Sequence, residues 1–194
     1  MTASSLSRRQ AMRCLGAAAC AALAAQRGAA AAELPGDSVY QLRVPLTDHN
    51  GQPFELASAR GQLVLVSMFY SSCEMVCPMI FETIHLTLKA LPAKERDRVK
   101  VLMISFDPAR DTVAVLKRTA QAHSCDEHWT LARADEAGAR KLAAVLGVQY
   151  RRLTSGEFNH SSTTLLLDRE GRIAARTGVL GSVDPALLKV LHEL

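Results

Sequence analysis

Apolar segments alternate with amphipathic ones along the chain, and this pattern predicts an α/β protein. Residues 63–70 and 99–106 are apolar almost throughout, which is typical of strands buried on both faces of a parallel sheet. Between them, residues 77–91 place Ile80 and Ile84 at helical spacing and end before a proline. This alternation predicts a central, mostly parallel sheet with helices on both faces.

The rest of the pattern completes this architecture. A hairpin is predicted over residues 39–56 around a turn at 48–51, and a second antiparallel hairpin over 163–177 around a turn at 168–171. The other expected elements are helices at about 112–122, 135–146 and 184–194, a short strand at 128–133 and an extended segment at 148–153. The sheet is therefore expected to be mixed, with an N-terminal β-hairpin extension and an antiparallel edge.

The first 32 residues have the composition of a targeting segment. Arg8 and Arg9 precede an alanine-rich apolar run, and small residues at 30–32 offer a cleavage site. The apolar run is shorter than the about 20 residues that a membrane span needs. We therefore expect an export signal at 1–32, of Sec or twin-arginine type, and one domain at 33–194. A periplasmic location follows, with association with the inner membrane surface left open.

Composition narrows the function classes. The chain has 194 residues, of which 48% are hydrophobic and 22% charged, as expected for one globular domain with an appendage. Its net charge of +4 comes without a basic stripe with interleaved aromatic residues, so no nucleic-acid partner is expected. After the signal, three cysteines remain, Cys73, Cys77 and Cys125, and an odd number leaves at least one thiol unpaired or metal-bound.

Cys73 and Cys77 form the most informative pair in the sequence. A buried strand runs into Cys73, and a helix pattern begins at Cys77, so both side chains fall on one helical face. Two such thiols can close a disulfide or bind one soft cation such as Cu(I). A purely structural disulfide is less favoured, because so short a loop removes little chain entropy. The helix N-terminus predicts a stabilised thiolate at Cys77.

Four motifs together resemble the Sco/SenC family of thioredoxin-fold copper carriers for cytochrome oxidase. They are C-x-x-x-C-P at 73–78, a strand followed by D-P-x-R-D-T at 104–112, Trp129 at the start of the next strand, and F-N-H-S at 158–161 before the last hairpin. The resemblance covers about residues 36 to 194. It implies a thioredoxin-like three-layer fold.

The resemblance also implies a site and a function. Cys73, Cys77 and His160 would bind one copper ion per chain, as Cu(I) or Cu(II). The protein would be a metallochaperone that delivers copper to the dinuclear centre of cytochrome c oxidase subunit II or to another acceptor. A periplasmic copper donor or thiol reductant would be a further partner. Delivery by ligand exchange needs no turnover chemistry, so enzymatic activity is not expected.

Asp107 has two interpretations. It can belong to a simple turn before a helix, in which Asp111 caps the helix and Arg110 pairs with a carboxylate. It can also lie at the carboxyl end of a strand near the metal and orient His160 or tune Cu(II) without binding it. The sequence favours neither.

Other functions stay open. Cys73 and Cys77 can be the redox pair of a thiol-disulfide oxidoreductase that reduces acceptor cysteines. The C-x-x-C spacing and cis-proline usual in that class are missing. Zinc binding and a peroxiredoxin-type peroxidase are less favoured, since neither a partnered general base nor a T-x-x-C motif is found. The histidine-rich run at 123–128 is expected to be an exposed loop, and His85 a solvated helix residue.

Overall fold

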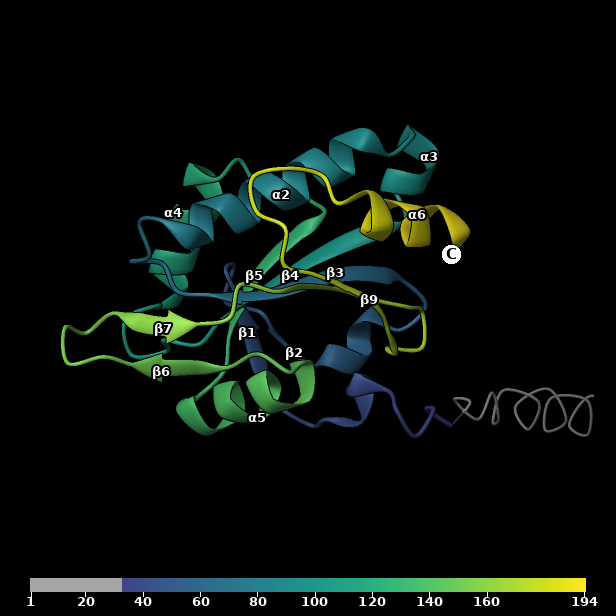
Figure 1. Ribbon diagram of the computed structural model, residues 1–194. Coiled ribbons are helices and arrows are strands. Elements are labelled where there is room, and N and C mark those ends of the chain that lie inside the picture. Colours follow the sequence, from purple (N-terminus) through teal and green to yellow (C-terminus); the bar gives the residue numbers. More distant parts are fainter. Residues whose placement is uncertain (1–32) are drawn as a thin grey trace, which may run out of the picture. The chain divides into compact units, whose positions relative to one another are not determined.

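A seven-stranded mixed sheet forms the centre of residues 33–194, the part of the chain that this computed structural model describes (Figure 1). The strand order is β2-β1-β5-β4-β3-β8-β9. The three central strands, β3 (Leu63–Phe69), β4 (Val99–Ser105) and β5 (Trp129–Arg133), run parallel. Every residue of β3 is buried, as its apolar sequence predicts. The export signal predicted at 1–32 lies outside the described residues.

Helices cover both faces of this sheet. Figure 1 shows α2 (Val76–Ala90), α4 (Val113–Ala122) and α6 (Pro185–Glu193) on one side, and α5 (Glu136–Leu146) on the other. A short helix, α3 (Ala93–Arg96), follows α2. The predicted three-layer arrangement is confirmed. Within residues 33–194, no helix combines the length and the apolar character needed to cross a membrane.

Antiparallel strands complete the two edges of the sheet. At one edge β8 (Thr164–Leu167) pairs with β3 and with β9 (Ile173–Thr177), as the second predicted hairpin requires. At the other edge β1 (Leu46–Asp48) pairs with β2 (Pro53–Phe54) and also with β5. The first hairpin is therefore present, and it continues the central sheet.

The first hairpin is shorter than its sequence pattern predicts. Residues Val39–Gln41 form a 3-10 turn, η1, rather than the start of a strand, and a second turn, η2, covers Leu56–Ala59. The reason is local, because the Ser38 hydroxyl caps η1 by accepting a hydrogen bond from the Tyr40 N–H, 3.2 Å away. Tyr40 is thereby turned into the core, where it is fully buried.

A separate two-stranded sheet lies beside the main one. Strands β6 (Tyr150–Arg152) and β7 (Phe158–His160) pair with each other and with no strand of the seven-stranded sheet (Figure 1). The sequence predicted the extended segment of β6 but assigned no strand to residues 158–160, which it placed only before the last hairpin. The short, polar β7 has no hydrophobic alternation that would reveal it as a strand.

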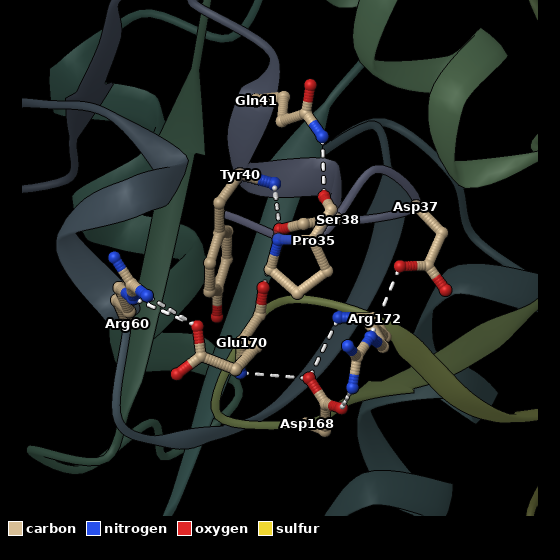
Figure 2. A network of polar contacts seen from close by, with 9 residues as sticks. All are labelled: Pro35, Asp37, Ser38, Tyr40, Gln41, Arg60, Asp168, Glu170 and Arg172. Carbon is tan, nitrogen blue, oxygen red and sulfur yellow. Dashed lines mark hydrogen bonds and ion pairs between the residues drawn. The ribbon is translucent and has the colours of Figure 1, made fainter. Parts of the chain in front are cut away.

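A network of polar contacts fastens the N-terminal segment to the turn between β8 and β9 (Figure 2). The Ser38 hydroxyl donates to the Glu170 carbonyl, and Glu170 also pairs with Arg60 at 2.7 Å. Arg172 pairs with Asp37 at 3.2 Å. These pairs are partly exposed, so each contributes little alone. Their joint effect is to hold the Tyr40 ring against the backbone of the turn.

Gly171 is the tightest point of this contact. Its φ is +79°, and a Cβ built there would lie 2.5 Å from the Tyr40 ring and 2.8 Å from the Ser38 hydroxyl. We expect Gly171→Ala to lower the free energy of unfolding by about 3 kcal/mol, from backbone strain plus overpacking. Gly61→Ala is the matched control, since Gly61 also has positive φ (+90°) but open space around it, and should cost only about 1–2 kcal/mol. Urea denaturation checks both, and equal losses would contradict the packing argument.

Candidate metal centre

The two cysteines lie where the central strand meets the helix that follows it. β3 ends at Phe69, a loop carries Cys73, and α2 begins at Val76, so that Cys77 lies in its first turn. Cys77 is buried and Cys73 half-buried, and both are free thiols. The loop lies at the carboxyl ends of the parallel strands, the edge at which sheets of this class hold their functional groups.

His160 joins this pair. One ligand atom from each of Cys73, Cys77 and His160 lies within 4.8 Å of the others, and within residues 33–194 no other group of three or more Cys, His or acidic side chains meets this test. The structure thus brings together the three residues that the sequence proposed as metal ligands, although His160 is on β7 and outside the main sheet. Two sulfurs and an imidazole nitrogen are a donor set that suits Cu(I), or Cu(II) with a further oxygen ligand.

The orientation of the His160 ring favours ligation through Nε2. Nδ1 lies 3.1 Å from the Ser161 carbonyl oxygen, which can only accept a hydrogen bond. Nδ1 therefore carries the hydrogen, and Nε2 keeps its lone pair. A histidine that binds a metal through one ring nitrogen commonly donates from the other to a backbone carbonyl, which fixes the tautomer.

The two thiols differ in acidity. Burial raises the pKa of Cys73, but hydrogen bonds from the Cys77 N–H and thiol and from the Met75 N–H, together with the nearby His160 ring, lower it to about 7. The Cys77 N–H lies 3.3 Å from the Cys73 sulfur. Burial raises the pKa of Cys77, and the nearby Cys73 and Asp111 raise it further.

The prediction of a stabilised thiolate at Cys77 is therefore wrong, and the more acidic thiol belongs to Cys73, four residues earlier. The free N–H groups of α2 point back toward Cys73, while Cys77 lies inside the helix and away from water. With a pKa of about 7, Cys73 is about half ionised at neutral pH, and it is the more acidic of the two thiols.

Alkylation of the metal-free protein should reveal this asymmetry. In a Cys125→Ser background, we expect Cys73 to react with iodoacetamide at a rate that rises with pH around a midpoint of about 7, since only the thiolate reacts. Cys77 should react far more slowly at every pH up to 8. Mass spectrometry of the labelled peptides measures both rates, and faster labelling of Cys77 would reverse the assignment.

The site opens into a cavity of about 500 Å³. It is lined by the cysteine loop (Tyr70 and residues 72–76) and by residues 157–160 of the β7 segment. Met75 stands on the rim and is 76% exposed. An incoming molecule can therefore reach the Cys73 side of the site, whereas Cys77 is buried and does not line the cavity.

Asp107 lies at the carboxyl end of β4, but it faces Arg110. Its carboxylate is buried and forms an ion pair with the Arg110 guanidinium. Among the described residues, no hydrogen bond or ion pair links Asp107 to Cys73, Cys77 or His160. The helix cap is also not Asp111 as expected, because the Thr112 hydroxyl accepts from the Val115 N–H.

Asp111 instead supports the cysteine loop, a role that the sequence did not indicate. It is fully buried, and its carboxylate accepts hydrogen bonds from the Ser71 N–H at 3.2 Å and from the hydroxyls of Ser71 and Ser105. It thereby ties the loop before Cys73 to the end of β4. Asp111 is the second aspartate of the D-P-x-R-D-T motif, and this motif was the one sequence signal that pointed to it. The motif alone does not reveal that its partner, Ser71, lies forty residues earlier in the chain.

The histidine-rich run at 123–128 is less exposed than expected. His123 stacks on Phe81 with 4.0 Å between ring centroids, and the His123 carbonyl lies 2.8 Å from Nε2 of His85. His85 is correspondingly half-buried against Trp129, at 4.5 Å, rather than solvated. These rings cover the outer side of the buried Phe81, and a second metal site is not formed there within the described residues.

Fold and site together define a thioredoxin-like protein with two cysteines and one histidine at the carboxyl edge of its sheet. The SCO1/SenC family model matches residues 35–193, and the chain therefore belongs to this family. A SCO2-like protein of Rickettsia prowazekii is 29% identical over 133 residues, which cover 66% of this chain and 63% of that protein. The mitochondrial protein SCO2 of Saccharomyces cerevisiae is 36% identical over 72 residues, covering 37% of this chain and 24% of that protein. The chain thus spans less than two thirds of these curated relatives.

Solved structures agree with the fold. ScoI of Bradyrhizobium japonicum, solved with copper bound, is 30% identical, with a TM-score of 0.62, covering 69% of this chain and 85% of that one. A SCO1/SenC family lipoprotein of Bacillus anthracis superimposes with a TM-score of 0.69 at 20% identity, covering 79% and 94%. The second similarity concerns the fold alone.

Proposed function

We propose that this protein binds one copper ion through Cys73, Cys77 and His160 and passes it to an acceptor protein. The observation that carries the proposal is the meeting of two sulfurs and an imidazole nitrogen within 4.8 Å. The pKa of Cys73 is lowered to about 7, so a large share of this thiol is already deprotonated near neutral pH, which favours metal binding. The similarity to the copper-bound ScoI of Bradyrhizobium japonicum supports copper over zinc.

The site is suited to releasing its cargo. Three protein ligands leave copper open to a further ligand, and the cavity exposes the Cys73 side to an incoming protein. Thiolates of an acceptor can then replace Cys73, His160 and Cys77 one at a time, with no net redox change. We propose the dinuclear copper centre of cytochrome c oxidase subunit II as the acceptor, on the basis of family membership, and the periplasm as the location, on the basis of the predicted export signal.

Copper titration tests the binding site. The reduced, metal-free protein should bind one Cu(I) and, separately, one Cu(II), and the Cu(II) form should show thiolate-to-copper charge-transfer absorption. Cys125→Ser should behave like the parent, whereas Cys73→Ser with Cys77→Ser should lose the absorption and both ions. Unchanged binding in the double variant would disprove the site.

A second function is favoured by the unequal acidity of the thiols. The Cys73 thiolate can attack an acceptor disulfide to form a mixed disulfide. The Cys77 sulfur, once deprotonated, then attacks Cys73, which releases the acceptor as a dithiol and leaves a Cys73–Cys77 disulfide. A periplasmic thiol reductant would restore the pair. Reduction of a model disulfide by the metal-free protein, faster than that by Cys73→Ser, would support this function, and equal rates would exclude it.

A further inference from the structure

The strand that carries His160 is not hydrogen-bonded to the sheet that carries the cysteines. β6 and β7 pair only with each other, through Tyr150↔His160 and Arg152↔Phe158. His160 lies at the base of this hairpin, and the turn over residues 153–157 forms its tip. Something other than strand pairing must therefore hold the hairpin, and the imidazole with it, over the two sulfurs.

Two side chains from the loops at the carboxyl edge of the main sheet reach the tip. Arg110 donates from Nη2 to the Gly156 carbonyl at 2.7 Å, and its guanidinium lies 5.8 Å from the centre of the Phe158 ring. Tyr70 donates its phenol hydrogen to Glu157 at 2.6 Å. Both donors come from the carboxyl ends of central strands, one after β4 and the other directly after β3.

Each of these donors is itself held in place. The buried Asp107 carboxylate pairs with Arg110, which fixes the guanidinium toward the tip. Tyr70 is buried, with its ring 5.1 Å from Phe158 and edge-on to His160 at 5.8 Å. Phe106 completes the packing, at 5.1 Å from Phe158 and 5.2 Å from His160. The contacts thus join the tip of the hairpin to the site.

We infer that Arg110 and Tyr70 are positioning residues that latch the β6–β7 hairpin so that His160 stays within reach of Cys73 and Cys77. The inference rests on the proposed copper site. It assigns a role to the D-P-x-R motif, in which Asp107 acts on His160 only through Arg110. Neither Arg110 nor Tyr70 binds the metal.

The latch predicts a selective loss. Without it the hairpin can pivot at its base, where residues 161–163 lead into β8, and the imidazole then spends part of its time away from the sulfurs. Among the described residues, no hydrogen bond or ion pair joins Arg110 to either thiol, so Arg110→Ala leaves the Cys73–Cys77 pair intact. Binding that needs His160 should weaken, and binding that the two thiolates support alone should not.

The test compares Arg110→Ala and Tyr70→Phe with Arg152→Ala in the full chain. Arg152 is the matched control, because its guanidinium also lies near the Phe158 ring, at 5.9 Å, but on the hairpin itself. In the metal-free protein, we expect amide hydrogen exchange in β6 and β7 to quicken at least about tenfold in Arg110→Ala, the size expected for one lost hydrogen bond to a charged group. Tyr70→Phe should show a smaller change, and Arg152→Ala none.

Copper binding gives the second measurement. In Arg110→Ala, the Cu(II) dissociation constant should rise at least about tenfold and the charge-transfer band should shift toward that of His160→Ala, while Cu(I) affinity stays within threefold. Arg110→Lys, which keeps the charge but loses the planar contact, should recover part of the loss. If Arg110→Ala does not fold, Tyr70→Phe decides by amide exchange in β6 and β7, because the Tyr70 phenol also interacts with Cys73 and can act on copper binding directly. Parental exchange in Tyr70→Phe would then disprove the latch.

The outcomes separate this inference from the function on which it rests. If His160→Ala loses Cu(II) and the latch variants bind like the parent, the latch is disproved and the copper site stands. Faster exchange with unchanged Cu(II) binding also disproves it, because the hairpin then moves without effect on His160. If His160→Ala itself binds Cu(II) normally, the three-ligand site is wrong.

Discussion

His160→Ala is expected to weaken Cu(II) binding at least about 100-fold, because it removes one of the three proposed protein ligands. Such a change should be at least as large as the loss of a supporting contact around a ligand. Cu(I) should still bind, since two thiolates suffice for a soft ion. The Cys73–Cys77 disulfide should still form on oxidation, because the histidine takes no part in it. Competition titrations with a chelator of known affinity measure both copper constants.

His192→Ala provides the matched control. That imidazole is exposed on α6 and contacts Glu95 at 2.5 Å, far from the cysteine loop in sequence and structure. It should bind both copper ions like the parent. If Cu(II) affinity falls to a similar extent in His160→Ala and His192→Ala, the titration reports binding to surface histidines. If His160→Ala binds Cu(II) as tightly as the parent, His160 is not a ligand.

Asp111→Ala should lower the free energy of unfolding by about 3 kcal/mol, because it leaves buried and half-buried donors without an acceptor. The Ser71 N–H and the hydroxyls of Ser71 and Ser105 all point at this carboxylate. The cysteine loop should lose order as well as stability. Urea denaturation measures the loss, and amide exchange around residue 71 locates it.

Asp184→Ala is the comparison for this prediction. Asp184 also accepts a backbone hydrogen bond, from the Ala186 N–H at 2.8 Å, but it is a half-buried helix cap. Its removal should cost only about 1 kcal/mol. A further effect concerns acidity. The Asp111 charge raises the pKa of Cys77, so Asp111→Asn should lower that pKa and speed alkylation of Cys77 in a Cys73→Ser background. Equal stability losses at 111 and 184, with unchanged alkylation, would refute the supporting role.

The sequence was most informative where a single local pattern decides the structure. The buried strands β3 and β4 and the helix α2 lie within a residue or two of their predicted bounds, because long apolar periodicity leaves few alternatives. The cysteine spacing likewise identified the dithiol. His160 is different, since nothing in its local sequence distinguishes it, and only the family motif singled it out.

The features that the sequence did not predict depend on contacts between residues that are far apart in the chain. That Asp111 faces Ser71, or that Arg110 faces Gly156, follows from how strand ends meet in space and has no local signature. The assignment of the acidic thiol failed for a finer reason. The helix α2 begins at Val76, one residue before the predicted start at Cys77, and this difference decides which sulfur accepts hydrogen bonds from the free N–H groups. Helix bounds are predicted from sequence only to within a few residues, so this detail was out of reach.

The attachment of the N-terminal segment has a practical consequence. Residues 35–41 are fastened to the turn after β8, and β8 runs antiparallel to β3, so this turn lies by Leu63, at the end of the sheet opposite the cysteine loop. A support or a fluorescent label joined at residue 34 would be held at the end of the sheet opposite the three proposed copper ligands. Immobilisation through that end should therefore leave docking by an acceptor unhindered, which suits surface-based measurement of metal handover.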